Sequence, residues 1–155
     1  FMRKYTDFWM GLRGMLKLYE KMLKNVCTAH DLAVTEADIL GFLKNNPDKD
    51  TAADIAELKM LSKGAVSKSV DSLIGKGLLQ RCPDKQDRRK IHLKITPEAD
   101  PVISDIIKVQ EEFRNAMFDG FTEEEYRTYE DYRIRLFENA KKTEEAGIDA
   151  GESIV

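Results

Sequence analysis

The sequence predicts a mainly α-helical protein with a small β wing (α+β), in which a winged helix–turn–helix is flanked by long N- and C-terminal helices. Two observations predict this class. Apolar residues recur at three- and four-residue steps over most of the chain, which is typical of amphipathic helices. Before residue 96 the spacing changes, because Ile91, Leu93 and Ile95 alternate with His92 and Lys94 as in a half-buried strand.

Two helices are expected in the first third of the chain. The first runs from Tyr5 to about Ala29, where basic residues lie between regularly spaced apolar ones. We expect the second to begin at Thr35, whose hydroxyl would cap it while Asp38 occupies the third helical position. Pro47 and the two asparagines before it end this second helix.

A pair of short helices follows. Thr51 is expected to cap the first of them with the help of Asp54, and Ser62 to cap the second. Gly77 supplies the left-handed residue that stops the second helix, and the small Ala56 lets the two helices cross closely. Two helices joined by so short a turn are typical of a helix–turn–helix.

Two short strands, Leu79 to Cys82 and Ile91 to Ile95, are expected to form a hairpin after these helices. The segment that joins them, PDKQDRRK, is polar and basic. Hairpin connections are usually about two to five residues, so this longer one indicates a loop that makes contacts.

Long helices complete the chain. Thr96 and Pro97 form one possible start for the next helix, and Asp100 and Pro101 form another, so a kink and a later beginning both stay open. Gly120 ends this helix. A staple of Phe121 on Tyr126 and a capping box then start a last helix from Thr122 to roughly Glu145.

The apolar stripes of the terminal helices are too long for the core of a small winged helix to cover. A second copy of the chain is the simplest partner, which predicts a homodimer. The expected organisation is an N-terminal dimerisation helix (1–34), a winged helix–turn–helix (35–96), C-terminal dimerisation helices (97–145) and a flexible tail (146–155).

The charge is unevenly distributed. The whole chain carries a net charge of -3, yet Lys59 to Lys94 contains ten basic and three acidic side chains. A basic segment on an acidic body is typical of a protein that binds nucleic acid with one surface, which makes double-stranded DNA the expected partner.

Other classes of function find little support in the sequence. No apolar run is long enough for a membrane span and no leader resembles a signal peptide, so we expect a cytoplasmic protein without a membrane partner. Cys27 and Cys82 indicate no disulfide framework, and His30 and His92 complete no metal spacing, so no cofactor is expected. Enzymatic activity is the weakest hypothesis, because no phosphate loop, nucleophile elbow or paired acid and base appears.

The candidate DNA-contacting residues form two groups. On the second helix of the helix–turn–helix they are Ser62, Lys63, Ser67 and Lys68, and on the wing they are Lys85, Asp87, Arg88 and Arg89. Short hydroxyls and lysines suit phosphate contact in the major groove, and an arginine suits the narrow minor groove. We expect Asp87 to orient a neighbouring arginine through a bidentate ion pair, and Asp71 to pair with a basic residue of the same domain.

In combination, these features resemble the MarR family of bacterial winged-helix regulators, over about Tyr5 to Lys142. The similarity is carried by the segment ADIAELKMLSKGAVSKSVDSLIGKGLL, by Asp87-Arg88-Arg89 in the wing and by LKIT after it. The resemblance implies an obligate dimer formed by the first and last helices, with Asp87 and Arg89 as the wing-tip pair. Many such proteins repress genes until a small aromatic or phenolic ligand binds.

For such an effector, the resemblance makes four residues candidates: Trp9, Met10, Arg13 and Phe42. The alternative for these side chains is plain dimer core. The resulting hypothesis is a dimeric, sequence-specific DNA-binding transcriptional regulator, a ligand-responsive repressor on a pseudo-palindromic operator. The alternative is a winged-helix module whose basic face binds an acidic protein.

Overall fold

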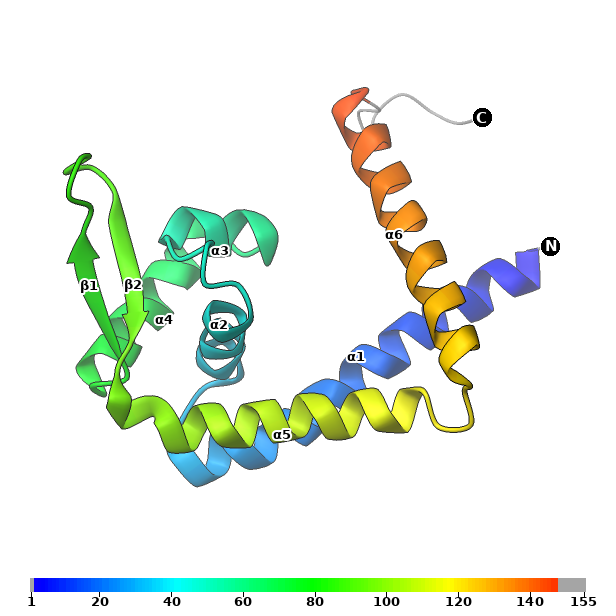
Figure 1. Ribbon diagram of the computed structural model, residues 1–155, viewed down its shortest axis with the longest axis horizontal. Coiled ribbons are helices and arrows are strands. Elements are labelled where there is room, and N and C mark those ends of the chain that lie inside the picture. The colour runs from blue at the N-terminus through cyan, green and yellow to red at the C-terminus, as the bar shows by residue number, and fades with distance from the viewer. Residues whose placement is uncertain (1, 148–155) are drawn as a thin grey trace. The chain divides into compact units, whose positions relative to one another are not determined.

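The computed structural model describes residues 2–147, and the chain divides into two compact units with the boundary after Phe113. In chain order the elements are α1 (Met2–His30), α2 (Val34–Asn45), α3 (Ala52–Leu58), α4 (Lys63–Gly75), β1 (Leu79–Pro83), β2 (Ile91–Ile95), a 3-10 turn (Pro97–Ala99), α5 (Asp100–Met117) and α6 (Glu123–Glu145) (Figure 1). The predicted class, mainly α with a small β wing, is confirmed.

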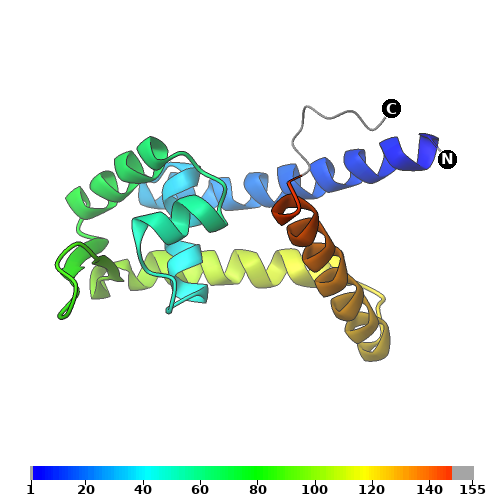
Figure 2. The same ribbon diagram turned by 90° about the horizontal axis from the view of Figure 1, so that it is seen from above.

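The first unit has a closed apolar core. Ile39, Leu40, Ile55 and Leu73 are fully buried in it. α1 and α5 run beside each other in Figures 1 and 2, where the Tyr19 ring meets Phe113 edge-on at 5.3 Å between centroids. The winged helix therefore shares its core with the adjoining parts of α1 and α5.

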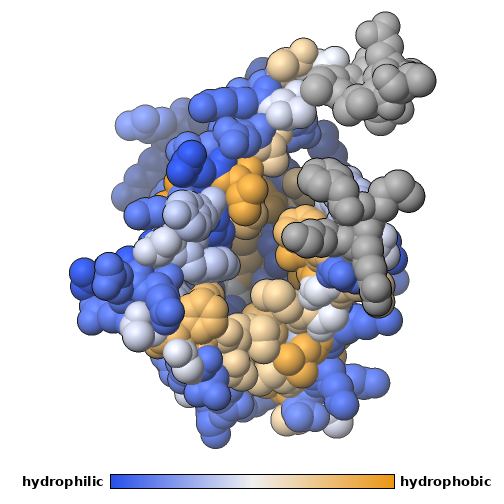
Figure 3. All heavy atoms as spheres, turned by 90° about the vertical axis from the view of Figure 1, so that its right-hand side faces the viewer, coloured by the Kyte–Doolittle hydropathy of each residue, from blue (hydrophilic) through white to orange (hydrophobic). Residues whose placement is uncertain are grey.

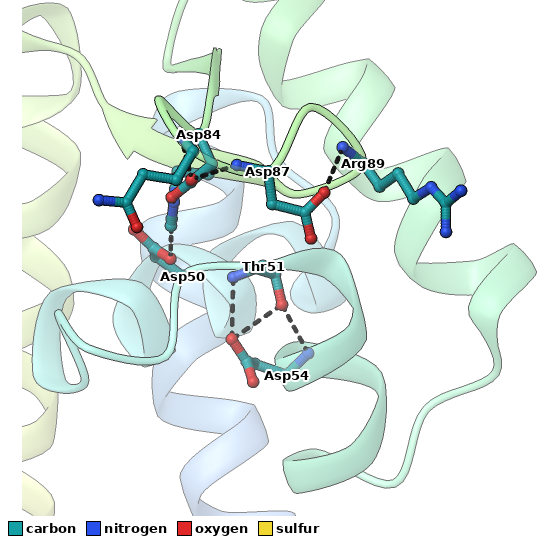
Figure 4. Close-up of polar contacts among 8 residues, drawn as sticks. Asp50, Thr51, Asp54, Asp84, Asp87 and Arg89 are labelled. Atoms are coloured by element: carbon teal, nitrogen blue, oxygen red, sulfur yellow. Dashed lines mark hydrogen bonds and ion pairs between the residues drawn. The ribbon is translucent and has the colours of Figure 1, made fainter.

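The caps predicted for the helix–turn–helix are confirmed. Thr51 Oγ1 accepts the Asp54 backbone N–H at 3.1 Å, and the Asp54 carboxylate accepts the Thr51 N–H at 3.1 Å (Figure 4). Ser62 Oγ accepts the Ala65 N–H at 3.1 Å. Gly77 has φ +74°, the left-handed conformation expected after α4.

The predicted start of α2 is wrong. The helix begins at Val34 and its N-cap is Ala33, whose backbone N–H donates to the Glu36 carboxylate at 3.0 Å. Glu36 is buried and also binds Lys76 Nζ at 2.8 Å, a partner forty residues away. Burial alone would raise the pKa of Glu36, but its hydrogen bonds to Lys76, Ser72 and Ala33 outweigh burial and lower it. A local bond between Ala33 and Glu36, with Glu36 held in addition by the distant Lys76, thus replaces the cap expected from Thr35.

The alternatives for the start of α5 are resolved in favour of the later beginning. A 3-10 turn follows Thr96, and the α-helix begins at Asp100. The Thr96 hydroxyl makes no capping bond and instead donates to the Gly77 carbonyl at 2.6 Å. Thr96 therefore ties the end of the wing to the end of α4.

In the second unit, the capping box of Thr122 with Glu125 is confirmed, with bonds of 3.2 and 2.8 Å. In place of the predicted staple of Phe121 directly on Tyr126, both side chains pack on Phe118, at 5.4 and 4.7 Å between ring centroids. Of the predicted tail, residues 148–155 lie outside the described residues. None of the helices between residues 2 and 147 has the length and apolar character that a membrane crossing requires.

Each unit exposes large apolar side chains. Phe8, Trp9 and Leu16 of α1 are 52%, 49% and 64% exposed, and no residue of α6 is buried. Apolar surface of this kind appears in orange in Figure 3. Such surface on the described helices is what a partner would cover.

Candidate nucleic-acid interface

The helix–turn–helix presents one face of α4 to solvent. Val66, Val70 and Leu73 point into the core and hold the helix in place. The opposite face carries the predicted residues Ser62, Lys63, Ser67 and Lys68, all of which are exposed. The structure thus brings these predicted contact residues together on one open helix face.

The turn before α4 has a strained residue. Met60 has φ +52° and its side chain is 88% exposed. Residues other than glycine, asparagine and aspartate rarely adopt this left-handed backbone conformation. The turn is closed by the Leu61 N–H, which donates to the Ala56 carbonyl at 3.0 Å. The strain accompanies the sharp change of direction between α3 and α4.

The wing is a two-stranded antiparallel hairpin in which Leu79 pairs with Ile95 and Pro83 with Ile91. Asp84 organises its loop. The Asp84 carboxylate accepts the backbone N–H groups of Gln86 at 2.8 Å and Asp87 at 2.9 Å. A hydrogen bond from His92, together with those two backbone N–H groups, lowers the pKa of Asp84 far below its ordinary value. The loop is therefore an ordered turn and presents its basic side chains from a defined backbone.

The role expected for Asp87 needs correction. Asp87 Oδ1 accepts the backbone N–H of Arg89 at 3.0 Å, and Figure 4 shows the Arg89 guanidinium pointing away from this carboxylate. None of the ion pairs between residues 2 and 147 joins Asp87 to an arginine. An aspartate readily bonds a backbone N–H two residues ahead, which here competes with the ion pair. Asp87 therefore shapes the loop and leaves the guanidinium open.

The basic side chains of this face have no acidic partner. Within the described part of the chain, no ion pair uses Lys63, Lys68, Lys85, Arg88 or Arg89, and all five are exposed. The one acid of α4, Asp71, binds Arg81 at 2.5 Å, as predicted. The positive charge on α4 and the wing is therefore left for an external anion.

The wing and the start of α3 border a shared hollow of about 440 Å³. Arg89 and Lys90 line it from the wing, and Thr51 and Ala53 line it from α3. The basic wing and the helix–turn–helix thus form one continuous surface.

A cluster that the sequence analysis missed lies at the base of the wing. His92 Nδ1 is 2.6 Å from Asp50 Oδ1, and His92 Nε2 is 2.8 Å from Asp84 Oδ2. Hydrogen bonds to Asp84 and then Asp50 raise the pKa of His92. These residues are 42 and 8 positions from His92 along the chain, so no local pattern connects them. In the sequence, the only sign of this cluster is that His92 occupies a polar position of the alternating strand Ile91–Ile95.

The effector candidates lie in two different environments. On α1, the Trp9 ring meets Phe8 edge-on at 5.4 Å and is half-exposed, and Met10 and Arg13 are exposed. Phe42 on α2 packs partly buried against the core. A hollow of about 360 Å³ between α1 and α5 contains none of the four and is lined by Leu12, Met15, Leu16, Tyr19, Gln110 and Phe113. The effector assignment therefore stays a prediction.

Cys27 and the metal-type side chains of the described residues indicate no second site. Cys27 is buried, and burial raises the pKa of its thiol. No group of three or more His, Cys, Asp or Glu side chains between residues 2 and 147 is arranged to hold a metal ion.

Comparison with known proteins agrees with this geometry. Residues 30–90 match the sequence model of the MarR family. The HTH-type transcriptional regulator PecS of Dickeya dadantii is 26% identical over 110 residues, which cover 70% of this chain and 66% of PecS. The chain thus aligns with slightly less than two thirds of the length of the curated relatives it matches, at 63% and 66%.

Solved structures share the fold. The transcriptional regulator PA3341 superimposes with a TM-score of 0.73 at 22% identity, over 88% of this chain and 97% of that one. MepR of S. aureus, crystallised as a complex with DNA, gives a TM-score of 0.56 at 19% identity, over 83% of this chain and 96% of MepR. Residues 30–90 thus match the model of the MarR family, and the chain has the fold of these solved transcriptional regulators.

Proposed function

We propose that the chain is a dimeric, sequence-specific DNA-binding regulator that acts as a repressor on a pseudo-palindromic operator. The observation that carries this proposal is the set of exposed lysines and arginines on α4 and the wing, which have no acidic partner among the described residues. DNA phosphates are the anions that such a surface fits, because neutralising them releases bound counterions.

The two parts of the face suit different parts of a duplex. α4 would enter the major groove, where Ser62, Ser67, Lys63 and Lys68 meet phosphates and base edges. Arg89, whose guanidinium is open in Figure 4, would reach the minor groove beside it. The likeness to MepR, a protein crystallised with DNA, supports this docking at the level of the fold.

Dimerisation is supported by the open apolar side chains of α1 and α6. Leu16 is 64% exposed, and Leu136 and Phe137 are 61% and 62% exposed. Covering such residues with a second copy would remove apolar surface from water at a gain of roughly 25 cal/mol per Å². A symmetric dimer would set two α4 helices about 34 Å apart, one DNA turn, and so favour an inverted repeat.

A small aromatic or phenolic effector would act by changing the distance between the two α4 helices of the dimer. The apolar hollow between α1 and α5 is one place for it, and Trp9, Met10, Arg13 and Phe42 remain the candidates from the sequence. A ligand that binds the DNA-free arrangement more tightly lowers DNA affinity by the same factor.

The experiment that tests this function is selection of duplexes from a random DNA pool by the purified chain at near-physiological salt, followed by sequencing. We expect enrichment of an inverted repeat with half-sites roughly 10 base pairs apart. Unselective binding that disappears as salt rises, or no binding, would contradict the proposal and favour an acidic protein as the partner of the basic face.

A further inference from the structure

A single histidine joins the wing to the helix–turn–helix. His92 lies on β2, and its ring stands between Asp84 of the wing loop, at 2.8 Å from Nε2, and Asp50 of the loop before α3, at 2.6 Å from Nδ1. Figure 4 shows these two carboxylates facing each other across the base of the wing. The backbone adds a parallel link, since the Leu93 N–H donates to the Asp50 carbonyl at 2.7 Å.

This arrangement requires a particular protonation state of the ring. An ionised carboxylate only accepts hydrogen bonds, and a neutral imidazole has a single N–H to donate. Both contacts form together only when both ring nitrogens carry a proton. The imidazolium is therefore the form that holds the wing, and loss of one proton breaks one of the two bonds.

Other charged groups lie near the ring on the wing and on the helices packed against it. On the wing, Lys85 and Lys94 line the same hollow as His92, and Cys82 is its cross-strand partner. Three acids of the neighbouring helices are already bound: Asp54 of α3 by Thr51, Asp38 of α2 by Lys59, and Glu36 of α2 by Lys76. The other acid of α3, Glu57, is exposed. Asp50 and Asp84 are thus the groups that face the ring directly among the described residues.

We propose that His92 is a proton-operated tie that fastens the wing to the loop before α3, so that the wing is held for DNA while the ring is doubly protonated and loosened when it is not. The DNA step of this inference rests on the proposed function. Because Asp84 also accepts two backbone N–H groups of the wing loop, a change at the ring reaches the backbone that carries Arg89.

The two hydrogen bonds of His92 determine how the tie should change with pH. The pKa of His92 is raised in the folded chain, so the tie is complete below the ordinary histidine pKa of about 6.5 and is lost as pH rises through the raised value. His30 is the internal control. It has one carboxylate partner, Asp105 at 2.7 Å, which a neutral ring satisfies with its single N–H.

The tie itself is tested without DNA, by ¹⁵N NMR of the two histidine rings in the full chain from pH 5.5 to 9, with His30→Gln for assignment. We expect both His92 nitrogens to be protonated at pH 5.5 with a deprotonation midpoint above about 6.5, and the amide-exchange protection of Leu93 to fall together with ring deprotonation. A His92 midpoint at or below about 6.5, or Leu93 protection that does not follow it, overturns the tie.

The DNA step is tested with the duplex selected from the random pool, at fixed salt. We expect the wild type to lose about fivefold in affinity between pH 6 and 8.5. The His92→Gln variant should bind at the weaker level at every pH, and His30→Gln should keep the wild-type dependence. An equal pH dependence in His92→Gln overturns the control of DNA binding by His92. Absence of binding at every pH overturns the proposed function, while the ring titration still decides the tie.

Discussion

The winged helix buries most of its apolar side chains and leaves the basic side chains of α4 and the wing tip without acidic partners. By contrast, α6 and the N-terminal half of α1 expose large apolar side chains, and α6 pairs several of its charges internally. In the winged helix, Ile55 and Leu73 are fully buried, and Arg89 has no acidic partner among the described residues. In α6, Arg127 binds Glu123 at 2.5 Å and Arg133 binds Glu130 at 2.5 Å, while Phe137 is 62% exposed.

The difference indicates what each region lacks. A folded chain gains most from apolar burial, so helices that keep large apolar side chains in water are incomplete as a single copy. A basic surface without acidic partners is destabilised by repulsion between its own charges, and a bound anion relieves this repulsion. We therefore propose that a second copy covers the terminal helices and that a nucleic acid binds the winged helix.

The largest effect is expected from Leu73→Ala in the core of the winged helix. Leu73 is 0% exposed, so its truncation should lower the free energy of unfolding by about 2–5 kcal/mol, measured by urea denaturation. Leu58→Ala removes the same atoms from a side chain that is 52% exposed and should cost less than about 1 kcal/mol. Equal losses in the two variants would show that burial in this unit does not decide its stability.

A smaller effect is expected from Leu16→Asp, which places a carboxylate on the open apolar face of α1. Leu16 is 64% exposed in the single chain, so the fold should survive while dimerisation weakens by about 2 kcal/mol or more. Light scattering over a concentration series measures the change. Lys17→Asp, the exposed neighbour on another side of the helix, is the matched control. A dimer that tolerates Leu16→Asp would remove this face from the interface.

Arg89→Ala tests the open charges of the wing. We expect specific DNA binding to weaken by about 1–3 kcal/mol, because the guanidinium loses its groove contact. The control is Arg127→Ala, which removes an arginine already paired with Glu123 and should leave affinity unchanged. Titration of a labelled duplex measures both variants. If both variants lose the same DNA affinity, the absence of an acidic partner does not identify the arginines that bind DNA.

The smallest effect is expected from Met60→Gly in the turn between α3 and α4. Met60 has φ +52° and is 88% exposed, so glycine removes backbone strain without losing packing. The free energy of unfolding should rise by about 0.5–1 kcal/mol. Met60→Ala keeps the Cβ atom and should bring no gain. A gain in both variants would place its cause in the side chain.

Local signals in the sequence predicted much of the fold. The caps at Thr51, Ser62 and Thr122 act within three residues, and the left-handed Gly77 follows the C-cap of α4, so both signals are visible in the chain itself. The open faces of α4 and the wing were also predictable, because the buried positions Val66 and Val70 fix which side chains point outward.

Contacts between distant residues were not predictable in the same way. The start of α2 depends on Glu36 binding Lys76, and the tie at the wing depends on Asp50 meeting His92. In each case a partner about forty residues away takes part in the contact, and no pattern within the local sequence shows it. For Asp87 the prediction failed because of a local contact. Its carboxylate accepts the backbone N–H of the nearby Arg89 and does not form the ion pair expected from its charge.

Native mass spectrometry of the chain mixed with its selected duplex would show whether the exposed apolar surface binds a second copy while the unpaired basic side chains bind DNA. We expect a dominant species with the mass of two chains and one duplex, and a dimer when DNA is omitted. A complex of one chain with one duplex, or a chain that stays monomeric at every concentration, would contradict the account.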